Sequence, residues 1–380
     1  MSFKSDVEFL RKHKDVIVLT DEKDLAKVAI VTDWQGRVMT STAGGDDGLS
    51  FGWLNRELIA SGDKQPHINV FGGEDRFWLG PEGGQFSIFF KKGDPFDLEH
   101  WFVPAAIDWD LFDVISVAKN SAVFTKKMHL KNYSDTEFDL EVKREIKLLP
   151  TDQISEFIGI RPDSAVKMVG YTSVNSIKNT GQKVWKKESG LLSIWILGMF
   201  NPSPKTTVII PYKPGSESEL GPVVNDAYFG KVPAGRLVVK DDVLFFRGDG
   251  KYRSKIGLSP LRCKPVFGSY DADNHVLTLV QFNFPEGETD YVNSMWELQD
   301  KPYSGDVVNS YNDGPAEPGA KPLGPFYELE TSSPAAQLQP QETLTHIHRT
   351  IHLTGDEAAL DKIAQKTLGV SLNEIKTAFK

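Results

Sequence analysis

Short runs of β-branched and aromatic residues recur along most of the chain, and turn-forming clusters stand between them. Such runs are typical of strands, and clusters of Asn, Asp and Gly are typical of the tight turns that join antiparallel strands. Gly, with 32 residues, and Pro, with 22, are numerous enough to supply many such turns. We therefore predict a mainly β protein with antiparallel sheets. The clearest predicted strands are residues 28–31, 87–90, 138–142, 192–196, 243–246 and 276–280.

Composition excludes several classes of protein. A chain of 380 residues with 40% apolar residues can bury one or two cores, which excludes an intrinsically disordered protein. The net charge of −9 disfavours a surface that follows nucleic-acid phosphates. The best apolar run, 191–200, is about half the length of a membrane span, and Cys263 has no second cysteine for a disulfide or a multi-cysteine zinc site. We expect neither a nucleic-acid partner nor a membrane span.

Helix signals are confined to the two ends of the chain. A short segment covers residues 5–13. Near the C-terminus, Asp356 is placed to cap one helix and Gly369 to end it, and Ser371 with Glu374 forms the capping-box pattern of a second. We expect these two helices to lie over a sheet. The predicted organisation is a single domain overall, with a helical segment at 1–14, a β-sandwich domain at 15–355 and the C-terminal helices at 356–380.

The segment 67–86 is the densest in glycine, charged and aromatic residues. Glycines allow the backbone to approach a ligand closely. Sugars need carboxylates and guanidinium groups for their hydroxyls, and aromatic rings for their apolar faces. A salt-bridged β-turn explains the same charges equally well. The candidate sugar-binding residues of this segment are Glu74, Asp75, Arg76, Trp78 and Glu82.

A second candidate site is the strand-like run 325–331. Alternation along a strand places Glu328 and Glu330 on one face, together with Phe326. Two neighbouring carboxylates raise each other's proton affinity, as a general base requires. A solvated strand face that carries two acidic residues is the alternative interpretation.

Residues 303–324 form the one loop-like stretch of unusual composition, rich in Gly, Pro, Asn, Ser and Asp. In a compact domain, a connection of this length is more often functional than incidental. We therefore expect this loop to contribute to function.

Three of the eight histidines, His346, His348 and His352, share one face of a predicted strand at 345–353. A His-x-His pair on a strand can bind zinc or another transition metal. His352 would lie about 13 Å from His348, too far to complete the same tetrahedral site. We therefore rank a packed or solvated histidine face above a metal site. Nucleotide-binding and metalloprotease motifs are absent from the sequence, and we predict no cofactor.

Two sets of motifs carry a resemblance to a known family. Residues 327–331, followed by Leu-Gln-Pro-Gln-Glu-Thr at 338–343, resemble the last motif of aldose 1-epimerases and their mutarotase-like relatives, in which a strand Glu precedes a Leu-x-Pro-Gly-Glu turn. Gly-Arg-Val at 36–38 and the segment 76–84 resemble the early glycine-arginine strand and the proline-glycine loop of that superfamily. Over nearly its full length, the chain is similar to an uncharacterised bacterial family with a galactose-mutarotase-like fold. The resemblance implies a large antiparallel β-supersandwich with a sugar site in a concave sheet.

The resemblance also implies roles for individual residues. Glu330 matches the mutarotase base, which takes the proton of the anomeric hydroxyl while a histidine protonates the ring oxygen. Glu328 takes this place if the register is shifted by two residues. The motif that carries the acid histidine in the family is not found, so His67 and His100 are candidates by position. Gln341 stands where the turn motif has glycine.

These observations predict a carbohydrate-active protein whose ligand is a mono- or oligosaccharide. If it is an enzyme, it is an aldose mutarotase or epimerase; the alternative is a non-catalytic glycan-binding or accessory protein that uses the same cleft. A metal-dependent lyase or hydrolase based on His346 and His348 ranks last. Arg37, Arg76 and Arg253 leave an acidic sugar open, or are bridged to nearby acids.

The residues themselves do not assign a cellular location or an oligomeric state. The N-terminus is polar at once, which fits a cytoplasmic protein or one whose leader has been removed. Proteins of the resembling kind are often exported, so the resemblance favours the periplasm.

Overall fold

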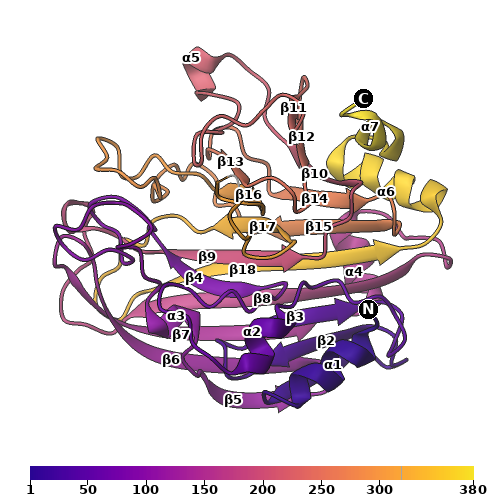
Figure 1. Cartoon of the computed structure of the whole chain (residues 1–380), viewed down its shortest axis with the longest axis horizontal. Helices are drawn as coiled ribbons and strands as arrows, with labels where there is room; N and C mark the ends of the chain where they lie inside the picture. Colours follow the sequence, from indigo (N-terminus) through magenta and orange to yellow (C-terminus); the bar gives the residue numbers. More distant parts are fainter. Residues whose placement is uncertain (318) are drawn as a thin grey trace.

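The described residues form three sheets in which all paired strands are antiparallel (Figure 1). The computed structural model describes residues 1–317 and 319–380, so Pro318 of the predicted loop lies outside the described residues. The mainly β, antiparallel fold class predicted from the sequence is confirmed. The smallest sheet, of three strands, comprises β1 (Val16–Thr20), β2 (Lys27–Val31) and β3 (Arg37–Thr42).

A ten-stranded sheet forms the body of the molecule, from β11 near the top of Figure 1 to β5 at the bottom. Its strands, in spatial order, are β11 (Leu237–Val239), β12 (Val243–Arg247), β10 (Thr206–Pro211), β14 (Val266–Asp271), β15 (Val276–Phe282), β18 (Thr343–Thr354), β8 (Lys167–Asn179), β7 (Glu137–Leu148), β6 (Ser121–Lys131) and β5 (Asp113–Ala118).

A five-stranded sheet packs against the ten-stranded one and carries the candidate site. Its strands, in spatial order, are β13 (Ser254–Leu258), β16 (Val308–Asn312), β17 (Tyr327–Ser332), β9 (Ser193–Phe200) and β4 (Arg76–Gly80).

The terminal helices follow the predicted signals. They are α1 (Phe3–Arg11), α6 (Glu357–Leu368) and α7 (Leu372–Thr377). The Asp356 side chain accepts a hydrogen bond from the Ala359 N–H, and Gly369 ends α6 with a φ of 77°. Ser371 and Glu374 form the expected capping box of α7.

Helices are not confined to the ends, contrary to the prediction. The internal ones are α2 (Arg56–Ser61), α3 (Ala105–Asp108), α4 (Thr151–Ile158) and α5 (Glu217–Leu220), with a 3-10 turn at Lys187–Ser189. They escape sequence analysis because they are short: α4 buries only Ile154 and Ile158, too few residues to show a helical period. Among the described residues, no helix is long and apolar enough to cross a membrane.

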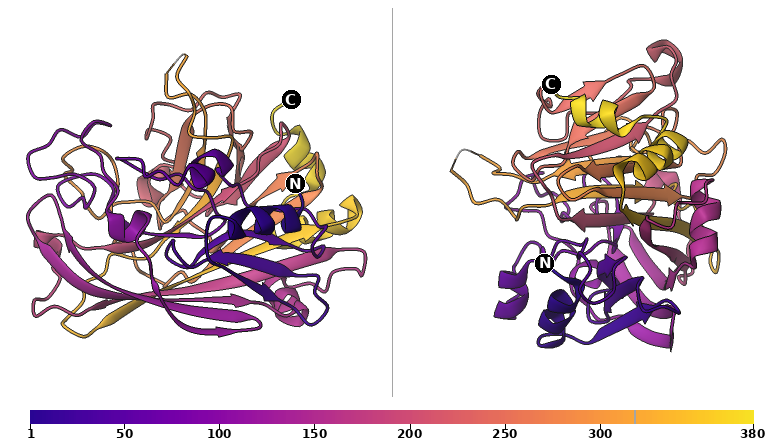
Figure 2. Two further views of the ribbon diagram at one scale, coloured as in Figure 1. Left: turned by 60° about the horizontal axis from the view of Figure 1, so that its bottom comes forward. Right: turned by 90° about the vertical axis from the view of Figure 1, so that its right-hand side faces the viewer.

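The two larger sheets share a core, and helices cover the opposite face of the ten-stranded sheet. On β10, Val208 and Ile210 belong to one buried cluster with Phe200 of β9 and Leu329 of β17. Ile209, which lies between them, belongs instead to the cluster that includes α4, α6 and α7 (Figure 2). Period-two alternation therefore separates the two cores and confirms that the C-terminal helices lie over a sheet.

Four of the six clearest predicted strands lie within strands of the structure, a fifth, 192–196, does so except for Leu192, and residues 87–90 form no strand. Ser87 closes a turn by donating to the Gly84 carbonyl, and the following residues are coil. Their apolar character serves side-chain packing instead, since Phe89 stacks on Trp101 with ring centroids 6.1 Å apart. Conversely, the predicted loop 303–324 contains β16, whose polar residues are held between β13 and β17.

Glu74 and Asp75, predicted as sugar ligands, are instead bonded in the interior between the sheets. Glu74 accepts hydrogen bonds from Ser41 and Tyr171 and contacts His352 Nε2 at 2.9 Å. Asp75 pairs with Arg144, and both side chains are fully buried. Charge clustered along the sequence gave no indication that these carboxylates point away from their neighbour Arg76.

Removal of the Asp75 carboxylate should destabilise the fold strongly. Asp75→Ala leaves the buried Arg144 guanidinium without its counter-ion, and loss of one partner of a buried pair costs about 3–5 kcal/mol. Denaturant unfolding monitored by circular dichroism measures this loss. Lys205→Ala, which breaks the exposed pair with Asp273, is the control and should change the unfolding free energy little. Equal effects of the two variants would contradict the structural role of Asp75.

Gln341 has a φ of 74°, in the left-handed region that favours glycine. It occupies the position at which the resembling turn motif has glycine. Gln341→Gly should therefore raise the unfolding free energy by about 1 kcal/mol. The control is Gln339→Gly in the same connection, where φ is not positive and no gain is expected. Thermal or denaturant unfolding of both variants tests this, and a loss of stability in Gln341→Gly would contradict it.

Candidate functional site

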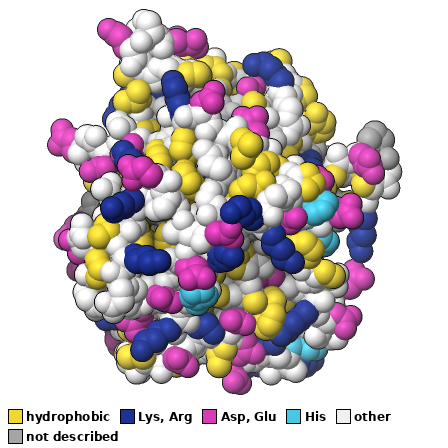
Figure 3. Space-filling model, turned by 90° about the vertical axis from the view of Figure 1, so that its left-hand side faces the viewer, with side chains coloured by type: hydrophobic (Ala, Val, Ile, Leu, Met, Phe, Trp, Pro, Cys, Tyr) yellow, Lys and Arg dark blue, Asp and Glu magenta, His cyan; other side chains and the backbone are white. Residues whose placement is uncertain are grey.

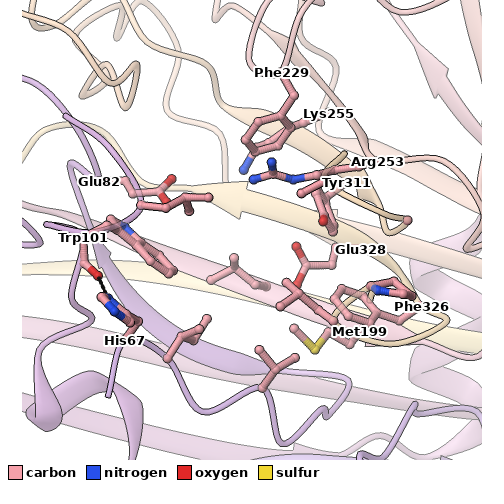
Figure 4. A pocket seen from close by; sticks show the side chains of 18 of the residues that line it. His67, Glu82, Trp101, Met199, Phe229, Arg253, Lys255, Tyr311, Phe326 and Glu328 are labelled. Carbon is pink, nitrogen blue, oxygen red and sulfur yellow. Dashed lines mark hydrogen bonds between the residues drawn. The ribbon is translucent and has the colours of Figure 1, made fainter. Parts of the chain in front are cut away.

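A cavity of about 330 Å³ lies over one face of the five-stranded sheet (Figure 4). This volume falls within the range of small-molecule sites, and the walls are mostly aromatic and aliphatic. The lining side chains that the sheet supplies or that immediately adjoin its strands are Arg76, Trp78, Trp195, Leu197, Met199, Arg253, Lys255, Tyr311, Phe326 and Glu328. Connections between strands complete the walls with His67, Glu82, Leu98, Trp101, Phe229 and Trp296, together with residues 314, 316 and 321–323 of the predicted loop.

The register of the sheet explains how the charged groups come together. Lys255, Tyr311, Glu328 and Met199 occupy paired positions on β13, β16, β17 and β9, so they form one row across the sheet. Cross-strand neighbours in such a row lie on the same face and within reach of one another. Glu330 stands two residues further along β17 on this face, which places it in the next row.

The next row brings Arg76 towards the same carboxylates. Arg76 pairs in register with Leu197, which in turn pairs with Glu330. Its Nη2 donates to Glu328 Oε1 at 2.9 Å, across the intervening strand β9. The guanidinium also lies 4.4 Å from the centre of the Trp78 ring. Although Arg76 is only 3% exposed, its Nε and Nη1 have no hydrogen-bond partner among the described residues.

Glu330 lies beneath the cavity wall rather than in it. Its Oε2 accepts hydrogen bonds from Lys255 Nζ at 2.9 Å and from Trp195 Nε1 at 3.0 Å. The side chain is fully buried, and Oε1 has no partner within the described part of the chain. Burial opposes the charge of Lys255, but the carboxyls of Glu330, Glu82 and Glu328 outweigh this effect and raise the pKa of its ammonium.

Two carboxyls of the cavity retain protons near neutral pH. Burial raises the pKa of Glu82 to about 7, against the opposing charge of Lys255. Burial also raises the pKa of Glu328 to about 8, although the Arg76 guanidinium favours the ionised form. Groups with a pKa near the working pH can both accept and donate protons, which suits them to general acid–base chemistry.

His67 and His100, both predicted as candidate acids, lie in different places. His67 lines the cavity on the side opposite Glu328 (Figure 4). Its Nδ1 donates to the Trp101 carbonyl at 2.7 Å, which leaves Nε2 as the free nitrogen. His100 contacts Asp97 and does not line the cavity. The hydrogen bond that the Asp97 carboxylate accepts from the imidazole raises the pKa of His100.

The structure therefore brings together five of the nine predicted site residues, namely His67, Arg76, Trp78, Glu82 and Glu328, with Glu330 directly behind them. Glu74, Asp75 and His100 lie elsewhere. Sequence analysis missed Lys255 and most of the aromatic wall. One signal could have located Lys255: it follows Arg253 by two residues after the turn cluster 248–250, so a strand there carries two basic side chains on one face.

The three histidines of β18 point into the interior. Thr331 Oγ1 lies 2.8 Å from His346 Nε2 and 2.9 Å from His348 Nδ1, and His352 contacts Glu74. Burial lowers the pKa of His346 to about 3 and that of His348 to about 4, so both rings are neutral. Within the described residues, no group of three or more His, Cys, Asp or Glu side chains is arranged to hold a metal ion.

The fold is shared with solved structures over nearly the whole chain. The Slr1438 protein from Synechocystis sp. PCC 6803 matches with a TM-score of 0.52 and 14% identity, over 90% of this chain and 96% of that one. A protein from Escherichia coli K12 named as a candidate aldose 1-epimerase matches with a TM-score of 0.52 and 11% identity, over 90% of this chain and 99% of that one. At such identities the likeness shows the fold alone, and it confirms the predicted mutarotase-like architecture.

Two sequence comparisons complement the structural ones. A family model described as "Family of unknown function (DUF6786)" matches residues 1–379. No curated protein matches the chain in sequence.

The Glu82 carboxyl should titrate with a midpoint near pH 7. Carbon-13 NMR of labelled carboxyls, with the resonance assigned by its loss in Glu82→Gln, measures the midpoint directly. Glu374, whose pKa is lowered by its hydrogen bonds to Ser371, is the internal control and should titrate far lower. Because the folded chain holds the Glu82 proton more tightly, this group should make the fold less stable as pH rises from 4.5 to about 7. A midpoint near 4.5 would contradict the burial of this group.

Proposed function

This chain belongs to a family of unknown function (DUF6786), and we propose from the geometry of its cavity that it binds a saccharide there. The observation that carries this proposal is the combination of aromatic walls with charged groups that converge on one sheet face. Arg76, Lys255 and Glu328 can bond paired hydroxyls, while the rings can contact the apolar faces of a sugar.

The arrangement of the aromatic side chains supports this proposal. Trp78 and Trp195 meet edge to face with centroids 5.6 Å apart, and Trp101 and Trp296 meet at 5.7 Å. Such contacts fix the rings in place, so a ligand that packs on them loses little side-chain entropy. The cavity therefore offers preorganised apolar surface beside its polar groups.

Exchange of the anomers of an aldose is the second candidate, and the carboxyls of raised pKa favour it. In such a reaction, a carboxylate takes the proton of the anomeric hydroxyl while an acid protonates the ring oxygen. The ring C–O bond breaks to give the open-chain aldehyde, and reversal on the other face gives the other anomer. Glu330 is the base that the resemblance implies, with Glu328 as the alternative and His67 as the histidine that lines the cavity.

Sugar binding should depend on the aromatic wall. Isothermal titration with a panel of mono- and oligosaccharides should identify a ligand for the wild type, and Trp296→Ala should weaken its binding about tenfold or more, equivalent to about 1.4 kcal/mol. Trp109→Ala is the matched control because Trp109 is also partly buried but lies outside the cavity. Failure of every saccharide to bind, or equal binding by Trp296→Ala and the wild type, would overturn the proposal.

The catalytic candidate has its own test. NMR exchange spectroscopy on the sugars that bind should show faster interconversion of anomers with the wild type. If Glu330 is the base, Glu330→Gln should reduce this rate by about 100-fold or more while the sugar still binds. An unchanged rate in the variant would assign the base elsewhere, with Glu328→Gln as the next variant. Binding without any acceleration would leave the protein a glycan-binding module.

A further inference from the structure

We propose that the saccharide bound by this cavity carries one negative charge, as a uronic acid does, that Arg253 receives its carboxylate, and that the free N–H groups of Arg76 bond to oxygen atoms further along the ligand. This inference rests on the proposed function, since it specifies the class of sugar. Three observations carry it: the charge balance of the cavity, the orientation of Arg253 and the unused donors of Arg76.

The charges of the cavity leave Arg253 without a counter-ion among the described residues. Arg76 is paired with Glu328, and Lys255 is paired with Glu330. Arg253 also lines the cavity, but no carboxylate of the described residues lies within ion-pair distance of it. Burial raises the pKa of Glu82 to about 7 and that of Glu328 to about 8, so both carboxyls contribute little negative charge below neutrality.

Arg253 is held in position to bind a ligand. Its guanidinium carbon lies 4.0 Å from the centre of the Phe229 ring, a cation–π contact that fixes the plane of the group without using its N–H donors. Figure 4 shows the guanidinium beside Lys255 and Tyr311, with Glu82 across the cavity. A planar guanidinium with free donors matches a carboxylate through two parallel hydrogen bonds.

Arg76 supplies the second set of donors. Its Nε and Nη1 are buried without partners among the described residues, and an unmet charged donor in such a place costs free energy until a ligand accepts from it. Arg76 and Arg253 line the same cavity, on β4 and just before β13, which are the two edges of the five-stranded sheet. A sugar that spans the sheet face can therefore place acceptors at both.

The acidic side chains around the cavity favour a single negative charge over two. A dianionic phosphate ester brings a second negative charge close to Glu328, Glu330 and Glu82, where it would repel any of these carboxyls that ionises. On the outer surface shown in Figure 3, basic and acidic side chains are interspersed, so charge selection depends on the groups inside the cavity.

The test compares sugars that differ only in charge. Titration calorimetry at about pH 6 should show that the wild type binds glucuronate or galacturonate at least tenfold more tightly than glucose or galactose. Arg253→Gln should reduce this preference to about twofold or less, whereas Arg253→Lys should retain part of it. Arg161→Gln, which removes one exposed positive charge outside the cavity, should keep the full preference.

Each contrary outcome has a distinct meaning. Equal binding of neutral and acidic sugars, or an unchanged preference in Arg253→Gln, overturns this inference and leaves saccharide binding intact. Tighter binding of glucose 6-phosphate than of glucuronate overturns the single-charge class, and tighter binding of a sulfate monoester overturns the carboxylate. Failure of all sugars to bind overturns the proposed function itself.

Discussion

The site depends on the buried contacts of Glu74 and Asp75, the two residues that precede β4. Their carboxylates bond to side chains of β7, β8 and β18, so the start of β4 is tied to the ten-stranded sheet. Arg76 follows directly and points to the opposite side, into the cavity. The ion pair between Asp75 and Arg144 lies on the side away from the cavity, directly before β4. It therefore helps to fix the position of the Arg76 guanidinium relative to Glu328.

Burial favours the neutral form of the carboxyls on the cavity side of the sheet, whereas Asp75 on the other side is ion-paired. Asp75 meets a guanidinium within an interior that holds both side chains in full contact with protein, whereas Glu82 forms no ion pair with any described residue. Desolvation then favours its neutral form, and the same effect acts on Glu328 in spite of Arg76. One sheet thus separates a buried, ion-paired network, which holds the fold, from groups that can change charge near neutral pH.

The alternation of side chains along the strands, with a period of two, made part of the site and the fold class predictable from the sequence. It placed Glu328 and Glu330 on one face, and the turn clusters between strands indicated the antiparallel fold. The opposite roles of Glu74 and Arg76 were not predictable, because their partners lie far away in sequence: 278 residues separate Glu74 from His352, and 252 separate Arg76 from Glu328. Residues 87–90 were predicted as a strand because apolar runs that pack as coil have the same composition as apolar runs that pair.

The environment of Glu330 favours sugar binding over proton transfer as the function of the cavity. Lys255 and Trp195 both donate to one of its oxygens and separate the carboxylate from the cavity. A sugar hydroxyl can bond to Glu328, Arg76 and Arg253 with these side chains in place, but it reaches Glu330 only after one of them has moved. Proton abstraction by Glu330 therefore requires a rearrangement that binding does not, and a ligand that draws Lys255 towards its own negative charge would supply the driving force for it.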